Sequence, residues 1–512
     1  MKSVHGYRLA TSFAQDDLFV GTKPGFVLLV FPQIEDCVAR MLLIALGVWL
    51  TAVSLSLSQP TAAYGAPDST SQDGTPGDAG TSSSDSGQRG SGTPREVASG
   101  ISSNPGEVNI VTGTGWLGQL LGFGKDSGVH LGGLWVGDAN VLMSGGLKPG
   151  DWSFNSLTLL DLSLDAEKLL GLKGGMFGAE FLHFSGQPTN QDAGVVQGYN
   201  SLPSLPPLDR AELYQLWWRQ ELFDGKLVFR IGKSVPTYDF NNVIRPVPVQ
   251  EESFFIPAVT GLIYTPVFKN PTLIGAMPGY YNSATGITTT VAPSKNLYLS
   301  YGFYDGNLAH GEQPGLHGLQ LKFNGYYFHI GEMGYAWRLG SQQKPGIFAF
   351  GLWHQTGKLV AADGDVENGA EGFYLFGSQR LWSRHPGQDN SGVSGFYQFG
   401  ANTSNAMFVR QYFGAGLTGF GLVPGRPRDS MGLGLAWSWL NRDHHAGEFF
   451  FPGVSSNTTR LRTNELILAF YYQMKLLSGV YFQPTLSYVP NPGRRPDIPD
   501  AVALTLRLIL LF

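Results

Sequence analysis

The sequence is poor in charge and in cysteine for a chain of its length. Charged residues make up 14% of its 512 residues, against about 25% in ordinary soluble domains. The formal net charge of −5 excludes the basic surface that nucleic-acid-binding proteins present, so we expect no nucleic-acid partner. The one cysteine, Cys37, precedes an export signal described below. The exported part therefore has no disulfide framework.

The chain also lacks the short motifs of common enzymes and metal sites. It contains no H-E-x-x-H motif, no G-x-S-x-G elbow and no metal-type Cys/His spacing. We therefore expect no catalytic residue, no metal and no cofactor, and predict that the protein is not an enzyme. Gly113, Gly115 and Gly118 do form a G-x-G-x-x-G run. No alternation of strands and helices follows them, so a dinucleotide site is rejected.

Long hydrophobic runs are absent except at residues 41–58. Arg40 precedes this run, and the small residues Ala63 and Gly65 follow it, which is the layout of a secretory signal peptide. We predict a signal peptide over residues 41–65, although a run of this length also allows a membrane anchor. Residues 1–40 resemble neither a fold nor a targeting signal, and we interpret them as an over-extended gene start.

Residues 66–115 are rich in Ser, Gly, Thr, Pro and Asp. Such a segment buries too little apolar surface to offset its ordering entropy, so we predict a disordered linker. Residues 116–512 remain for the folded domain.

The folded part has many glycines and aromatic residues, and its apolar residues alternate with others. The chain holds 69 glycines and 13% aromatic residues, and its mean hydropathy is −0.05. From Val129 onward, alternating segments of roughly ten residues recur between turn clusters, a pattern typical of membrane β-barrels. The segments number about sixteen, with one poorly defined at residues 275–283. We predict an all-β fold, a closed antiparallel transmembrane barrel of about sixteen strands.

The strand count also predicts which connections are long. With both termini on the periplasmic side, the Asp-Gly turn at residues 223–226 joins strands four and five on that side. The same count makes residues 234–274 the third external loop. By analogy with general porins, we expect this loop to fold into the lumen and narrow it.

The last ten residues, ALTLRLILLF, alternate up to the terminal Phe512. Leu504, Leu506, Leu508 and Leu510 share one face, which we predict to meet lipid. Arg507 lies on the other face, which we expect to line the wet interior of the barrel.

Two central strands carry the most informative polar pattern. If Tyr214 and Leu216 face lipid, then Leu213, Gln215, Trp217 and Arg219 face the lumen, and Arg230 does so on the next strand. Charged and amide groups can bind sugar hydroxyls, and an aromatic ring can stack on the apolar face of a pyranose. A nonspecific aqueous pore would show the same pattern, so the residues alone leave both readings open.

Several quoted segments resemble the carbohydrate-selective porins of the OprB-like family. They include LYQLWWRQELFDGKLVFRIGKSVPTYDF, GEMGYAW, EGFYLFGSQRLW and the terminal QPTLSYVPNPG followed by LRLILLF, and the match runs from about Trp116 to Phe512. The resemblance implies a sixteen-stranded outer-membrane barrel for passive diffusion of monosaccharides such as glucose. It also implies a lumen constriction of charged and aromatic residues. The chain departs from the family pattern at Thr485 and Ser487, where the family usually has Asp and Gln.

Together these considerations define the candidate residues and partners. The candidate lumen residues are Gln215, Trp217, Arg219, Arg230, Asp239, Asn242, Arg245, Glu251, Glu252, Glu371, Gln379 and Arg507. The terminal Phe512 is predicted to be read by the outer-membrane barrel assembly machinery. The expected partners are sugars, outer-membrane lipid and that machinery, and the expected location is the bacterial outer membrane. The alternatives are a general diffusion porin, a structural or adhesive barrel, and an outer-membrane lipase, for which no convincing Ser/His pair is present.

Overall fold

The computed structural model describes most of the chain from residue 115 onward. The described residues are 115–124, 126–202, 208–244, 260–279, 281–312, 314–315, 319, 321–361, 364–386, 389, 391–441, 462–493 and 495–512. The predicted start, signal peptide and nearly all of the linker therefore lie outside them.

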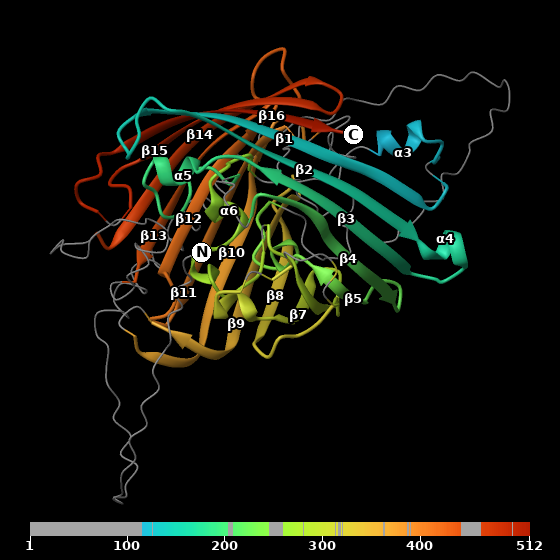
Figure 1. Ribbon diagram of the computed structural model, residues 1–512. Coiled ribbons are helices and arrows are strands. Elements are labelled where there is room, and N and C mark those ends of the chain that lie inside the picture. Colours follow the sequence, from blue (N-terminus) through green and yellow to red (C-terminus); the bar gives the residue numbers. More distant parts are fainter. Residues whose placement is uncertain are drawn as a thin grey trace, which may run out of the picture. The chain divides into compact units, whose positions relative to one another are not determined.

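Sixteen strands close into one antiparallel barrel, as predicted (Figure 1). Each strand pairs with its neighbours in the sequence, and β1 pairs with β16 to close the ring. The strands are β1 Val129–Ser144, β2 Trp152–Asp165, β3 Gly175–Ser185, β4 Arg210–Leu222, β5 Leu227–Ser234, β6 Ala284–Val291, β7 Leu297–Asp305, β8 Tyr327–Leu339, β9 Lys344–Val360, β10 Val366–Ser383, β11 Gly392–Asn402, β12 Val409–Phe420, β13 Ser430–Leu440, β14 Asn464–Leu477, β15 Val480–Val489 and β16 Ala501–Leu511.

The helices within the described residues are few and short. They are α3 Trp116–Leu120, α4 Ala166–Leu170, α5 Thr189–Asp192 and α6 Thr265–Phe268, with 3₁₀ turns η1 Pro236–Tyr238, η3 Pro271–Leu273 and η4 Asn307–His310. In the described part of the chain, no helix is long and apolar enough to cross a membrane.

The two faces of the strands differ as the alternation predicts. On β16, Thr505 and Arg507 are buried on the inner face, while Leu506 and Leu508 are part-exposed on the outer face. Other outward apolar side chains are more than half exposed, for example Leu352 and Leu433. An apolar outer surface of this extent matches the lipid-facing band of outer-membrane barrels.

The connections confirm the predicted parity. Long connections between strands at one end span residues 186–209, 235–283, 306–326 and 441–463, while the other end has connections such as 223–226 and 478–479. In the 223–226 turn, Phe223, Asp224 and Gly225 all have positive φ, a conformation that tight hairpins require. The short-turn end, where β16 ends and β1 begins, corresponds to the periplasmic side of such barrels.

The sixth strand does not lie where we predicted it. We expected it within residues 275–283, but β6 is Ala284–Val291, with the sequence ATGITTTV. Residues 275–283 instead end the third loop, which therefore spans residues 235–283 rather than 234–274. The β-branched run favours the extended strand, whereas Pro278 cannot donate a ladder hydrogen bond within a central strand.

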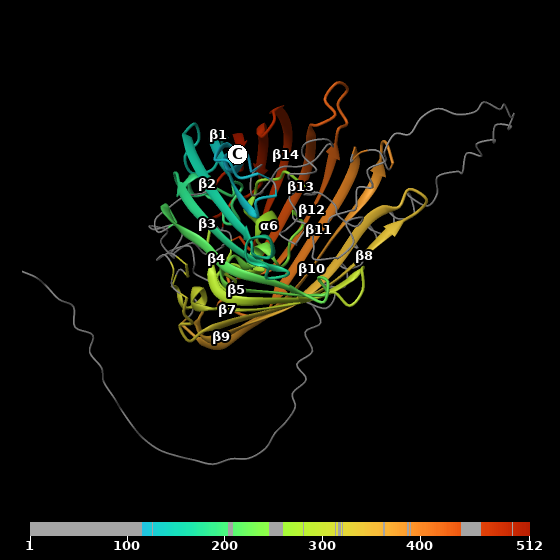
Figure 2. The same ribbon diagram turned by 90° about the vertical axis from the view of Figure 1, so that its right-hand side faces the viewer.

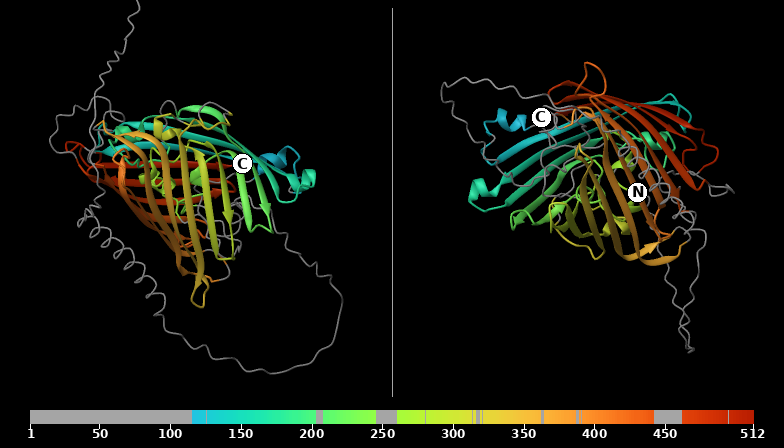
Figure 3. Two further views of the ribbon diagram at one scale, coloured as in Figure 1. Left: turned by 90° about the horizontal axis from the view of Figure 1, so that it is seen from below. Right: turned by 180° about the vertical axis from the view of Figure 1, so that it is seen from behind.

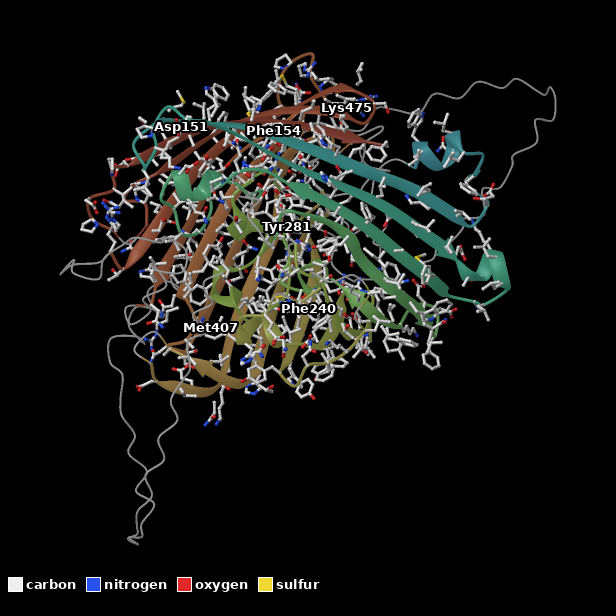
Figure 4. The ribbon with its side chains drawn as sticks, in the orientation of Figure 1. Asp151, Phe154, Phe240, Tyr281, Met407 and Lys475 are labelled. Carbon is white, nitrogen blue, oxygen red and sulfur yellow. The ribbon has the colours of Figure 1, made fainter. Side chains whose placement is uncertain are left out.

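The third loop lies inside the ring of strands. The views in Figures 1 and 2 both show α6 surrounded by the barrel wall, and the view from below in Figure 3 agrees. Phe240 and Tyr281, near the two ends of this loop, also lie in the interior (Figure 4). Loop side chains such as Tyr264 and Leu273 pack with inward strand residues such as Tyr374 and Tyr412 in one buried cluster. This cluster fills part of the barrel interior.

A bulge in β4 reverses two predicted orientations, those of Leu213 and Tyr214. Glu180 on β3 pairs with Gln215, whereas the next residue, Phe181, pairs with Leu213, so Tyr214 is an extra residue in the ladder. Phe181 is exposed on the outer face, and Leu213 shares that face with it. Tyr214 is instead buried, and its hydroxyl accepts a hydrogen bond from the Tyr281 backbone at 2.9 Å. An inserted residue reverses the facing of everything beyond it, which strict alternation cannot reveal.

Candidate functional site

A cluster of charged and aromatic side chains lies on the inner wall of β4 and β5. Arg219 and Arg230 are directly paired across these strands. The Arg230 guanidinium forms an ion pair with Asp239 of the third loop and lies 5.6 Å from the ring centroid of Trp217. Arg219 forms an ion pair with Glu221, with 2.5 Å between Nη1 and Oε1. We call Trp217, Arg219, Glu221, Arg230 and Asp239 the charged cluster.

The start of the third loop places Asp239 in this cluster. Pro236 begins the short turn η1 directly after β5, and Asp239 follows the turn. Its Oδ2 atom also accepts hydrogen bonds from the hydroxyls of Thr288 at 3.2 Å and Tyr304 at 3.4 Å. The carboxylate is thereby held against the wall while 23% of the side chain stays exposed.

Gln215 and Asn242 support the same loop rather than join the charged cluster. The Gln215 side chain accepts a hydrogen bond from the Val235 backbone at 3.3 Å and donates one to Glu180 at 3.0 Å. Asn242 donates to the Thr237 carbonyl at 3.2 Å and accepts from the Ile244 backbone at 3.0 Å. Both side chains therefore stabilise the first part of the third loop.

A buried carboxylate that we did not predict fixes this loop further along. Glu332 on β8 is 5% exposed. It accepts hydrogen bonds from the Asn241 backbone at 2.7 Å and from the hydroxyls of Tyr298 at 2.7 Å and Tyr374 at 2.8 Å. An acidic residue at an inward position of the GEMGYAW segment was the signal that could have identified it.

The later part of the third loop is attached to the opposite wall. The Tyr264 hydroxyl donates to the Leu435 carbonyl at 3.2 Å, and Asn270 donates to the Phe399 carbonyl at 3.2 Å. Gln483 donates to the Gly261 carbonyl at 2.8 Å. The loop therefore leaves β5, crosses the interior and binds β11, β13 and β15.

Lys269 adds a positive charge to this loop. It follows α6 directly, is part-buried, and forms no ion pair with any residue that the structure describes. Burial lowers the pKa of Lys269 to about 7, because the charged form loses hydration that no counter-charge replaces.

The second loop, residues 186–209, also folds against the inner wall. Glu465 on β14 accepts hydrogen bonds from the backbones of Val196 at 2.9 Å and Gln197 at 2.8 Å, and from Gly493 at 2.7 Å. Asn200 donates from its side chain to Asp138 at 2.8 Å. This second carboxylate anchor was likewise missing from our predictions.

Arg507 is on the inner wall, as predicted, but the second loop covers it. The side chain is 3% exposed and forms a two-pronged ion pair with Asp138 across the β1–β16 seam. Ser201 of the second loop is also within 3.4 Å of it. Arg507 therefore contributes to closing the barrel, and its charged group is compensated by Asp138.

Two predicted lumen residues lie on the wrong face. Tyr374 of β10 points inward, so Glu371 and Gln379, an odd number of residues away, lie on the outer face. The Glu371 side chain is 73% exposed beside His354, and Gln379 accepts a hydrogen bond from Trp337 at 2.8 Å. We chose both by residue type, but polar side chains also occur outside a barrel where its strands leave the apolar band. The other three predicted residues, Arg245, Glu251 and Glu252, lie outside the described residues.

The arrangement is suited to binding a polar, uncharged solute. Arg and carboxylate groups side by side offer donors and acceptors for hydroxyl pairs, and Trp217 offers an aromatic surface. Among the residues described by the structure, no group of three or more metal-ligating side chains is present.

Comparisons with known proteins agree with this architecture. The family description "Carbohydrate-selective porin, OprB family" matches residues 157–512. Porin B of Pseudomonas aeruginosa is 23% identical over 407 residues, which cover 74% of this chain and 86% of that protein.

One solved structure shows the same fold with a TM-score above 0.5. The high-pH structure of Pseudomonas putida OprB has a TM-score of 0.65 and 19% identity, and the match covers 80% of this chain and 99% of that one. Its low-pH structure covers the same shares with a TM-score of 0.49 and 15% identity. Because the family match spans well over half of the chain, this protein belongs to the OprB family of carbohydrate-selective porins, outer-membrane channels of Gram-negative bacteria.

Proposed function

We propose that this porin gives passive, energy-independent diffusion of monosaccharides such as glucose. The observation that carries the proposal is the Arg230–Asp239 ion pair beside Trp217, in which both charged side chains remain partly exposed on the inner wall. A pyranose can stack on the indole while its hydroxyls bind the guanidinium and the carboxylate. Binding must stay weak, in the millimolar range, so that release does not limit flux.

The third loop supports this proposal by its placement. It begins beside the charged cluster, crosses to the opposite wall at Gly261 and returns to β6, which supports a route for the solute past the cluster. Arg245, Glu251 and Glu252 belong to the same loop and remain proposed constriction residues.

Liposome swelling with purified protein tests the function. Glucose, other monosaccharides, disaccharides and amino acids of similar size are compared. We expect monosaccharides to enter faster than amino acids of equal size. Equal entry would favour the alternative, a general diffusion porin for small polar solutes.

We infer further that the chain is exported by a signal peptide at residues 41–65 and begins as a mature protein near residue 66. N-terminal sequencing of protein from outer membranes tests this. A mature chain that retains residues 1–40 would contradict it.

We propose two further partners of the barrel. Outer-membrane lipid contacts its apolar outer face, and the barrel assembly machinery binds its last strand. The last strand pairs with β1 up to Leu511, and Phe512 exchanges backbone hydrogen bonds with Gly133 at 2.8 and 2.9 Å. We propose that the assembly machinery reads this strand before β1 takes its place. Deleting Phe512 should lower the amount of assembled barrel in outer membranes, with equal assembly contradicting the idea.

A further inference from the structure

Arg380 is a buried cation on the inner wall of β10 that the charged cluster does not use. Arg380 is 5% exposed, and its guanidinium carbon lies 5.2 Å from the ring centroid of Phe420 on β12. The Nη1 atom makes no hydrogen bond within the described protein. Asp389 acts on it through its charge, but this carboxylate is hydrogen-bonded to Ser391, at 2.8 Å from the backbone nitrogen, and to His385, at 3.2 Å from Nδ1.

Two buried serines lie on the inner face of the strands next to Arg380 and Phe420. Ser394 is paired with Arg380 across β10 and β11, and Ser430 is paired with Phe420 across β12 and β13. Directly paired residues share a face of the sheet and have Cβ atoms about 5 Å apart. Both serines are at most 2% exposed, and neither Oγ atom has a hydrogen-bond partner within the described protein. The guanidinium over Phe420 and the two serines therefore lie on the inner face of the four neighbouring strands β10 to β13.

These three groups are all able to donate hydrogen bonds. A guanidinium has donors only, and a hydroxyl can rotate to donate. A buried guanidinium whose Nη1 donor makes no hydrogen bond within the described protein is stabilised by an anion that accepts one. These three donors are therefore suited to binding an anion, and the Phe420 ring provides an apolar surface beside them.

We propose that Arg380, Ser394 and Ser430 form an anion-binding subsite on the permeation route, which takes the carboxylate of a sugar acid or a small inorganic anion. This inference rests on the proposed function, because it adds carboxylated sugars to the solutes of the same channel. The subsite would be a second binding site in the channel, because the charged cluster lies along β4 and β5 and the subsite along β10 to β13.

The subsite lies beyond the third loop, toward the short-turn end. The loop meets β11 at Gly400, which lies against Asn270 and Thr272. Ser394 is six residues from Gly400 along β11, or about 20 Å at roughly 3.3 Å per residue. An anion that has passed the loop would meet Arg380 before it leaves on the periplasmic side.

Ion-current measurements in planar bilayers test the subsite, with glucuronate as the probe. Arg380→Gln should raise the concentration of glucuronate that half-inhibits the current about tenfold, as expected for losing one charge-assisted bond. The double variant Ser394→Ala/Ser430→Ala keeps the charge and should raise it several-fold. The control variant is Arg428→Gln, which removes a positive charge from the exposed turn before β13 at the short-turn end. It should leave the half-inhibiting glucuronate concentration unchanged. Heat-modifiable migration on gels checks that each variant is a closed barrel.

The outcomes separate this subsite from the proposed function. Unchanged glucuronate inhibition in folded Arg380→Gln overturns the subsite, as does an equal loss in Arg428→Gln, which indicates a general charge effect. If Arg380→Gln does not fold, unchanged inhibition in the double serine variant overturns it. Glucuronate inhibition that depends on Arg380, in a channel that excludes glucose, supports the subsite and rejects the proposed function. If chloride competes with glucuronate at constant ionic strength, the subsite binds inorganic anions. If chloride does not compete, the ligand is the sugar carboxylate.

Discussion

Asp138 and Arg507 face each other across the seam where the barrel closes. The Arg507 Nε and Nη2 atoms each lie 2.7 Å from one oxygen of the Asp138 carboxylate, and the two residues are directly paired between β1 and β16. Their side chains are 3% and 0% exposed. The first and last strands of the chain are thus joined by a buried, bidentate ion pair as well as by their backbones.

Removing one member of this pair should destabilise the barrel. We expect Arg507→Gln to lower the free energy of unfolding by about 3–5 kcal/mol, because a buried carboxylate is left without its partner. The matched control, Arg495→Gln, removes the exposed pair with Asp497 and should change it by less than about 1 kcal/mol. Urea unfolding in detergent, followed by tryptophan fluorescence, measures both. Equal effects of the two variants would show that burial at the seam does not matter.

Glu332 should hold the third loop in place. Its carboxylate accepts one backbone and two tyrosine hydrogen bonds, so Glu332→Ala should weaken the attachment of the loop by roughly 2–3 kcal/mol. We expect a larger and noisier single-channel current and faster entry of disaccharides in liposome swelling. Glu371→Ala, on the outer face of the neighbouring wall, is the control and should behave like wild type. A wild-type current in Glu332→Ala would exclude this role.

The charged cluster should determine the affinity for glucose. Asp239→Asn and Trp217→Ala should each raise the glucose concentration that half-inhibits the ion current about five- to tenfold, since each removes a contact worth roughly 1 kcal/mol or slightly more. Trp382→Ala changes a tryptophan that is 46% exposed and should leave glucose inhibition unaltered. If both cluster variants match wild type, the cluster does not bind the sugar.

Lys269 should make the ion selectivity depend on pH near neutrality. Because its pKa is lowered to about 7, the side chain is mostly neutral at pH 8 and gains its positive charge as the pH falls to 6. The anion preference, measured as the reversal potential in a salt gradient, should therefore increase as the pH falls. Lys269→Met should abolish this change and resemble wild type at pH 8. A change of the opposite sign, or one that persists in Lys269→Met, would falsify the assignment.

Much of the fold was predictable from the sequence. The alternating segments that recur from Val129 onward predicted the strand count, and the alternation around Arg507 predicted the facing of β16. The turn at Asp224 and Gly225 predicted which end carries the long connections. These features are local, since a residue's facing follows from its neighbours two positions away. Within β4 the alternation failed at Tyr214, because a bulge changes the facing without a clear local signal.

The candidate site was only partly predictable. Trp217, Arg219, Arg230 and Asp239 come together as expected, because two hairpin-linked strands and the first loop turn are close in sequence. Glu332 and Glu465 were missed because their partners, such as Asn241 and Gln197, are far away in the chain.

The sequence by itself determined that this chain forms a lipid-facing barrel with a polar interior, because a strand of period two exposes each face to one environment throughout its length. Only the tertiary structure decided which inward charges stay available to a solute. Arg507 and Arg230 are both inward arginines, yet Asp138 and the second loop enclose the first, while the second stays partly exposed beside Asp239. The difference arises from loops that fold back into the barrel, whose contacts join residues far apart in the chain.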